Sequence, residues 1–146
     1  MNENEEYIAT AIRQWVGSGF YTHDEIDSMV DDIAEEDCDI EELKATIGPA
    51  LRAKLRAERG WPAVTDCDRL DAVFNQLEEA GICALSNAGY TMSDGFTEVA
   101  EARAMAPTGY YRGFCFYHGQ EVERAVDGEG LMLAFGDLED NPAATL

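Results

Sequence analysis

The alternation of helical and strand-like patterns after residue 60 constrains the fold of this chain more than any other feature. Between residues 66 and 137, three helical patterns alternate with three short apolar segments, in the order α-β-α-β-α-β. The segments are ICALSNAG, YYRGFCFYH and LMLAFGDL. Such alternation favours parallel pairing through right-handed crossovers. We therefore expect an α/β or α+β fold, with a small three-stranded, mostly parallel sheet and flanking helices. The last helical pattern is short for a crossover, which leaves one antiparallel pairing open.

The first 60 residues carry apolar side chains at helical spacing throughout. Gly17 is expected to end the first helix, and Thr22 with Glu25 forms a capping box that starts the second. The Gly48-Pro49 pair predicts a kink or a restart in a later helix. The segment GWPAVTDCD separates this helical part from the rest. We predict a helical N-terminal segment, residues 1–60, packed on the sheet of an α-β-α-β-α-β unit, residues 61–146, with a frayed tail EDNPAATL.

The charge of the chain decides which partners fit it. Thirty acidic residues face ten basic ones, a net charge of -20. Residues 1–60 carry 15 acidic and 6 basic side chains, and residues 61–146 carry 15 and 4, so no basic half is hidden by the average. Such a surface repels nucleic-acid phosphates and anionic membranes, and it favours basic protein partners. The common alternative is a solvated surface without a partner.

The cysteine usage and the N-terminus predict a cytoplasmic protein. The start MNENEEYIAT lacks the basic and apolar regions of a signal peptide, and no apolar segment has the length of a membrane span. Four cysteines without a CxxC motif are expected to be reduced thiols. Two EF-hand-like acidic segments lack the required ligands, and zinc would need a second close pair of ligands. We therefore expect no metal and no cofactor.

Cys115 and His118 lie three residues apart in the aromatic segment and invite a nucleophile-and-base interpretation. Side chains alternate between the faces of a strand, so Phe114, Phe116 and His118 would share one face and Cys115 the other. Burial among aromatic rings also raises the pKa of a thiol. Cys115 is therefore predicted to be a core residue.

Two junctions between a strand and the following helix form the candidate site. They are SNAGYTMSDG, residues 86–95, and the turn at His118, and both would emerge at the carboxyl edge of a parallel pair, where α/β proteins bind ligands. The amides at the start of the helix after His118 would suit an anion or a carbonyl oxygen. Turn and capping chemistry is the competing explanation, with Ser93 or Asp94 as the N-cap of the helix. The acid/base candidates are His118, Asp94 and Glu121, and the ligand-binding candidates are Asn87, Tyr90, Ser93 and Gln120.

The segments GICALSNAGYTMSDGF and GFCFYHGQEVERAVDGEGLMLAFG resemble a family of uncharacterised bacterial proteins, the domain of unknown function 6891. The resemblance covers roughly residues 61–137. It implies a bacterial origin and a coherent domain, and it brings no activity with it.

Three functions remain compatible with the sequence. The first is a cytoplasmic protein-interaction or regulatory module that binds a basic protein. The second is a small-molecule binder or small enzyme that uses the cleft between the two junctions. The third is a stable domain whose loops are only turns. A homodimer is also possible if the aromatic strand, residues 111–118, lies at an exposed edge rather than in the centre of the sheet.

Overall fold

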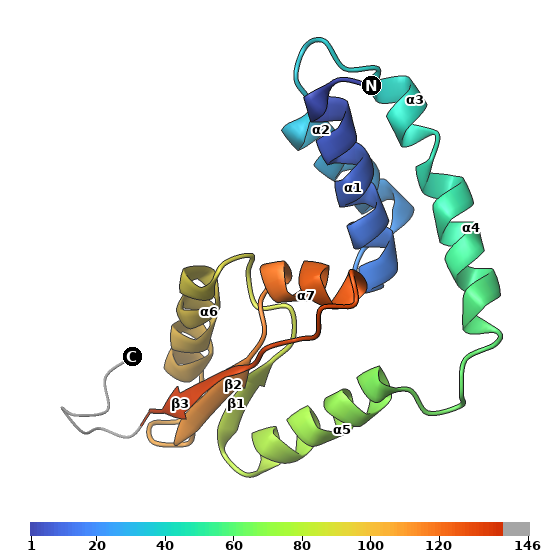
Figure 1. Ribbon diagram of the computed structural model, residues 1–146. Coiled ribbons are helices and arrows are strands. Elements are labelled where there is room, and N and C mark those ends of the chain that lie inside the picture. Colours follow the sequence, from blue (N-terminus) through green and yellow to red (C-terminus); the bar gives the residue numbers. More distant parts are fainter. Residues whose placement is uncertain (139–146) are drawn as a thin grey trace. The chain divides into compact units, whose positions relative to one another are not determined.

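This computed structural model describes residues 1–138 of the 146-residue chain, and they form seven helices and three strands (Figure 1). The tail EDNPAATL, which was expected to fray, lies outside the described residues. The chain divides into two units, residues 1–62 and the part that begins at residue 63, and each has its own apolar core. The first unit contains α1 (Glu3–Ser18), α2 (His23–Ile33), α3 (Ile40–Lys44) and α4 (Ile47–Glu58). The second contains α5 (Asp66–Glu79), β1 (Ile82–Leu85), α6 (Met92–Met105), β2 (Gly113–Phe116), α7 (Gly119–Val126) and β3 (Ala134–Asp137).

The helices of the first unit begin and end at chemically suitable residues. The predicted capping box of α2 is confirmed: the Glu25 amide donates to the Thr22 hydroxyl at 3.2 Å, and the Glu25 carboxylate accepts from the Thr22 amide at 3.1 Å. The predicted end of α1 at Gly17 is wrong by two residues, because Gly19 takes the left-handed conformation (φ 77°) that closes the helix. The restart predicted at Gly48-Pro49 is confirmed, since a new helix begins at Ile47 and holds Pro49 in its first turn.

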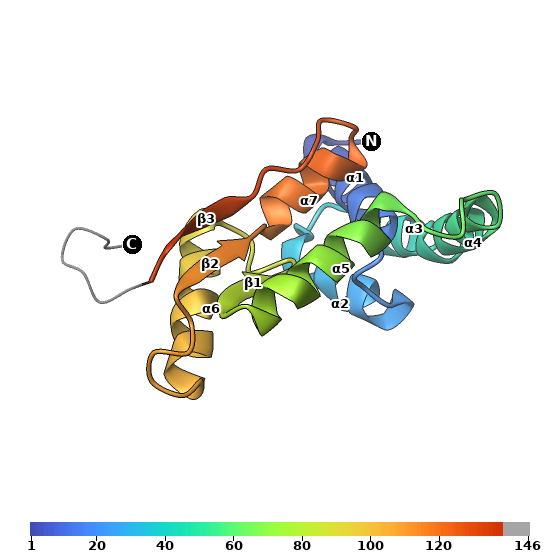
Figure 2. The ribbon, with the colours of Figure 1, turned by 90° about the horizontal axis from the view of Figure 1, so that it is seen from below.

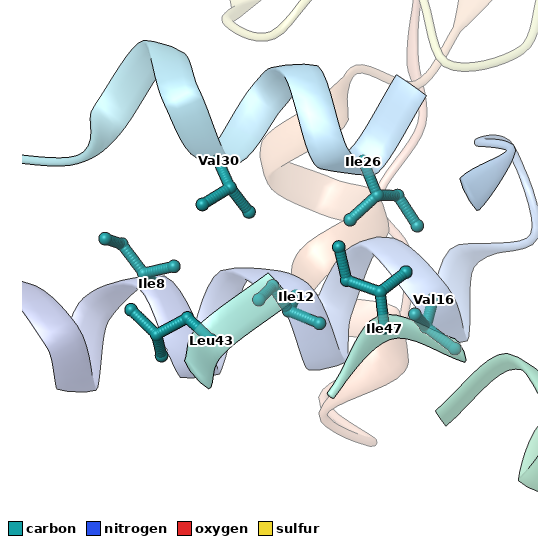
Figure 3. Packing of buried hydrophobic residues seen from close by; sticks show 7 residues of the cluster. All are labelled: Ile8, Ile12, Val16, Ile26, Val30, Leu43 and Ile47. Atoms are coloured by element: carbon teal, nitrogen blue, oxygen red, sulfur yellow. The ribbon is translucent and has the colours of Figure 1, made fainter. Parts of the chain in front are cut away.

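The core of the first unit joins all four of its helices. Apolar residues at helical spacing on α1 and α2 face each other, and α3 and α4 close the cluster (Figure 3). Lys44 of α3 also pairs with Asp27 and Asp31 of α2 at 3.0 and 2.8 Å. The buried members of the core are Ile8, Ile12, Val16, Ile26, Val30, Leu43 and Ile47.

The sheet of the second unit is mixed and has the order β1-β2-β3. β1 pairs with β2 in parallel, and β2 pairs with β3 in the antiparallel direction. The expectation of a mostly parallel sheet is therefore wrong, and the antiparallel alternative holds. The reason lies in the connection from β2 to β3, whose single eight-residue helix is short for the crossover that parallel pairing needs.

The aromatic strand β2 is the central strand of this sheet, which settles the question of its position. Its Phe114 and Phe116 side chains pack on one face against Phe96 of α6, with ring centroids 5.6 and 5.4 Å away. Cys115 and Tyr117 lie in a separate cluster on the other face, where α5 and α7 pack. The predicted alternation of side chains is confirmed for residues 114–117.

Candidate functional site

The two strand-to-helix junctions emerge at one edge of the sheet. The parallel register pairs Leu85, the last residue of β1, with Phe116, the last residue of β2. The chain segments that follow are joined by a backbone hydrogen bond of 2.8 Å from the Ala88 amide to the Tyr117 carbonyl. The seven candidate residues therefore belong to two neighbouring loops and the helices that follow them.

The loop between β1 and α6 is shaped by two left-handed residues, Asn87 (φ 50°) and Gly89 (φ 65°). A side chain at Gly89 would meet the Cβ atom of Asp94, so only glycine fits the close approach of the loop to the start of α6. Asn87 thus has a conformational role that asparagine fills better than most residues.

Asp94 is engaged at the start of α6. Its carboxylate accepts hydrogen bonds from the amides of Tyr90 at 3.2 Å and Thr91 at 3.1 Å. The prediction that Ser93 or Asp94 caps α6 is wrong, because Thr91 is the N-cap and Asp94 is its partner in a capping box. Hydrogen bonds from Thr91 and Tyr90, with a smaller contribution from the nearby His118, hold the pKa of the Asp94 carboxyl below its ordinary value. Ser93 is exposed, and its carbonyl accepts from the Thr97 hydroxyl at 3.1 Å.

His118 is the N-cap residue of α7, but its side chain makes no capping hydrogen bond. The residue is only 6% exposed, and its Nδ1 atom is buried without a hydrogen-bond partner, alone among the buried side-chain nitrogens and oxygens of residues 1–138. An unsatisfied buried polar atom of this kind needs an explanation in strain, function or water.

The amides at the start of α7 do not point to an open site. The Gly119 amide donates to the Gly89 carbonyl at 2.8 Å, and the Gln120 amide donates to the Tyr90 carbonyl at 3.1 Å. The Glu121 amide donates to the carbonyl of His118, the preceding N-cap, at 3.0 Å. The prediction of an anion site at these amides is therefore wrong, because the neighbouring loop already satisfies two of them.

The remaining candidates tie loops together. Tyr90 donates its hydroxyl hydrogen to the Glu123 carboxylate at 3.0 Å, although the residue is 48% exposed. The Glu121 carboxylate accepts from the amide of Met132 at 3.3 Å and pairs with Arg124 at 3.4 Å. The Gln120 side chain belongs to an exposed residue.

Taken together, this edge brings a carboxylic acid and an imidazole near each other. His118 contributes to the lowered pKa of the Asp94 carboxyl, yet the Asp94 carboxylate is already bound by the backbone amides of Tyr90 and Thr91. Cys115 packs among the apolar side chains that α5 and α7 cover, and burial raises the pKa of its thiol. Within residues 1–138, no group of three or more His, Cys, Asp or Glu side chains is placed to hold a metal ion.

A pocket of about 360 Å³ lies at the far end of α6 from these residues. It opens between the last turns of the helix and the following loop, and Arg103 is its charged member. From Thr91 to Ala104 the helix rises by roughly 20 Å at its usual 1.5 Å per residue, so the pocket and the candidate residues are separate features. The other lining residues are Ala100, Ala104, Ala106, Thr108, Gly109 and Leu138.

Sequence reasoning missed Glu78, whose carboxylate closes the outer side of β1. It accepts from the Ala84 amide at 2.9 Å and from the Tyr111 hydroxyl at 2.7 Å. The hydrogen bond to Glu78 raises the pKa of the Tyr111 hydroxyl above its ordinary value. A glutamate in the last turn of a helix that runs directly into a strand was the available signal, because such a side chain can reach the edge of that strand.

The comparisons with known proteins place the chain in a family. Over residues 1–146 it matches the family model described as "Domain of unknown function (DUF6891)", and the chain belongs to this family. The match includes the helical first part and so extends beyond the resemblance at residues 61–137. Searches of curated proteins and of solved structures gave no match. No helix within residues 1–138 combines the length and the apolar character that crossing a membrane requires.

Proposed function

We propose that this protein is an interaction module that binds a basic protein partner. The observation that carries the proposal is the amount of negative charge that stays on the surface. Residues 24–42 hold eleven acidic side chains, and all but Asp27 belong to exposed residues. Lys44 is the only basic residue between residues 24 and 51. A surface of this sign accelerates encounter with basic proteins and disfavours acidic ones.

The proposed setting is the cytoplasm. All four cysteines of the chain, Cys38, Cys67, Cys83 and Cys115, are free thiols. Reduced thiols are usual where glutathione and thioredoxin systems operate, and this supports an intracellular encounter with the partner.

The two junctions at the edge of β1 and β2 support a second, weaker candidate, a small-molecule site. The unpartnered Nδ1 atom of His118 is the observation in its favour. Against it stand the amides of Gly119 and Gln120 and the carboxylate of Asp94, which the two loops use for their own hydrogen bonds. A thermal-shift screen of small molecules on wild type and His118→Ala separates the two candidates, since a ligand that stabilises only the wild type would favour a small-molecule site at His118.

The test of the main proposal is affinity capture from the source lysate by the immobilised chain, at about 50 mM and about 500 mM NaCl. Beads that carry carboxylates at matched charge density are the control for simple ion exchange. We expect one basic protein to be retained by the chain at low salt, released at high salt and absent from the control beads. Retention that does not change with salt, or the same set of proteins on both matrices, would contradict the proposal.

A further inference from the structure

The three-stranded sheet has two outer edges, and the part of the chain that the structure describes closes only one of them. At β1, the Ala84 amide donates to the Glu78 carboxylate at 2.9 Å, so a side chain of α5 occupies this edge. At β3, which lies at the other edge of the sheet in both ribbon views, no strand within residues 1–138 pairs on the outer side (Figures 1 and 2).

The register shows which backbone groups of β3 point outward. The Leu138 amide donates to the Arg112 carbonyl at 2.9 Å, and the register pairs Gly136 with Phe114. Backbone groups of an antiparallel strand alternate in direction, so Leu138, Gly136 and Ala134 bond toward β2. The amide and carbonyl of Phe135 therefore point toward the open edge.

An apolar patch accompanies this open edge. Phe135 is 80% exposed, although it pairs in register with the buried Cys115. Met132 and Leu133, just before the strand, are 68% and 39% exposed. These three residues form the β3 patch. An edge strand that combines outward backbone groups with exposed apolar side chains is a template for pairing with another strand.

The charge around the β3 patch selects the kind of strand that fits. Residues 121–138 carry five acidic side chains and one basic one, Arg124. Arg124 already pairs with Glu121 and Glu129, each at 3.4 Å. Glu121 also accepts from the Met132 amide, which places a carboxylate directly beside the patch. A second copy of the chain would bring an equally acidic segment to the same place, and like charges disfavour that pairing.

We infer that the outer edge of β3 is the docking surface for an extended, basic segment of the partner protein. The incoming strand bonds to the outward amide and carbonyl of Phe135, covers the β3 patch with apolar side chains and places lysine or arginine among the surrounding carboxylates. The basic character of the partner rests on the proposed function, whereas the location of the surface rests on the sheet.

The test measures binding of a short, fluorescently labelled peptide that alternates lysine with valine, by anisotropy against the full chain. One comparison peptide has glutamate in place of lysine, and another has alternate backbone amides methylated so that it cannot pair as a strand. Phe135→Pro removes the outward amide, which bonds to no other strand, and proline is tolerated at such edge positions. Phe135→Thr keeps the amide and removes the ring. Met105→Ser, at a residue 89% exposed at the end of α6, is the control for loss of an exposed apolar side chain.

We expect the lysine peptide to bind the wild type and the Met105→Ser variant alike at low salt. The affinity of the lysine peptide falls by about tenfold or more in Phe135→Pro, which loses both the ring and the hydrogen bond from the outward amide. It falls by less in Phe135→Thr, which keeps that amide. A tenfold change in affinity corresponds to about the free energy that one hydrogen bond contributes. Circular dichroism shows whether each variant keeps its fold. If Phe135→Pro unfolds, the comparison of Phe135→Thr with Met105→Ser and the methylated peptide still decide the question.

Each other outcome overturns a distinct statement. Equal, salt-dependent binding to wild type and both Phe135 variants removes the β3 edge as the surface and leaves the proposed function standing. Equal binding of the glutamate and lysine peptides removes the basic partner and therefore the proposed function. Absence of peptide binding rejects this docking surface, while lysate capture still judges the function. Self-association of the wild type that Phe135→Pro abolishes assigns the edge to a second copy.

Discussion

Gly95 shows how a single residue allows the second unit to pack. It lies in the first turns of α6, directly against the Phe116 ring, and a Cβ atom at this position would meet three atoms of that ring. Phe116 is fully buried in the centre of the sheet and cannot move aside without disturbing its neighbours. We expect Gly95→Ala to lower the free energy of unfolding by about 1–3 kcal/mol, as overpacked cores do.

The measurement is unfolding in urea, monitored by far-ultraviolet circular dichroism. Ser93→Ala, at an exposed position in the same turn, is the matched control and is expected to change stability by less than about 0.5 kcal/mol. Equal stability of Gly95→Ala and wild type would mean that α6 can shift away from the sheet.

Cys83 gives the second unit a pH dependence on the alkaline side. The residue is 0% exposed, and burial, with a smaller contribution from the Glu78 carboxylate, raises the pKa of its thiol from 9.0 to about 11. Between these pH values the unfolded chain releases the proton while the folded chain keeps it. Because the folded state then binds more protons, the free energy of unfolding falls as the pH rises through this window.

We expect the wild type to lose more stability than Cys83→Ala between pH 9 and pH 11, the two pKa values that bound the window. Denaturant unfolding at several pH values gives both slopes. Other groups, such as Cys115 and Tyr111, also titrate late, so the difference between the two proteins isolates Cys83. Parallel slopes for the two proteins would show that the Cys83 thiolate is accommodated in the fold.

At the scale of the element, the starts of the helices repeat one chemical device. Asn2 with Glu5, Thr22 with Glu25, Thr65 with Asp68 and Thr91 with Asp94 each form a capping box. The sequence made the second of these predictable, because Thr-x-x-Glu is the usual pattern. The two Thr-x-x-Asp boxes are harder to predict, because aspartate is itself a common N-cap residue.

The capping box of α6 also fixes the loop that carries Asn87, Tyr90, Ser93 and Asp94 of the candidate site. Removing the capping hydroxyl therefore tests how much this loop contributes to stability. Thr91→Ala removes the hydroxyl that accepts from the Asp94 amide at 3.2 Å. We expect a loss of about 1 kcal/mol in the free energy of unfolding, and Thr91→Ser should restore most of it because it keeps the hydroxyl.

The dependence of stability on acid pH gives a second test of the Thr91–Asp94 capping box. Hydrogen bonds, first of all from Thr91, lower the pKa of Asp94 in the folded state, so the stability they provide is present above the unfolded pKa and is lost as the pH falls through the folded one. Thr91→Ala removes the contribution of the Thr91 hydroxyl and keeps the backbone amides of residues 90 and 91, so it should reduce this acid loss only in part, as measured by thermal unfolding from neutral to acid pH. An unchanged acid profile would argue that other donors hold Asp94.

Element order was predictable from the sequence, whereas relations between segments distant in the chain were harder to predict. The three strands and the alternation along β2 follow from local patterns. The antiparallel direction of β3 depends on the length of the connection between β2 and β3, which is short for a parallel crossover. The amides of Gly119 and Gln120 looked available because nothing in their own segment shows that the carbonyls of Gly89 and Tyr90 reach them. The two junctions emerge at one edge of the sheet, as the parallel pairing of β1 and β2 requires, but the hydrogen-bond partners of their residues could not be predicted from the sequence.

At the scale of the whole molecule, charge affects both stability and binding. A net charge of -20 on 146 residues makes the folded chain repel itself, and the repulsion is greatest where acidic residues are dense. Salt screens this repulsion over a Debye length of about 10 Å at 0.1 M. The same screening weakens attraction to a basic partner. Salt should therefore move stability and affinity in opposite directions, which distinguishes electrostatic binding from a loss of folded protein.

We expect the melting temperature to rise when NaCl is increased from about 10 mM to about 500 mM, by several degrees for each kcal/mol gained. Differential scanning calorimetry measures it. The matched variant neutralises three exposed residues of one acidic segment, Asp32→Asn, Glu35→Gln and Glu36→Gln. This variant should melt higher than wild type at low salt and respond less to added NaCl, because part of the repulsion is already gone. A melting temperature that is independent of salt in both proteins would mean that the acidic surface is well solvated and carries little self-repulsion.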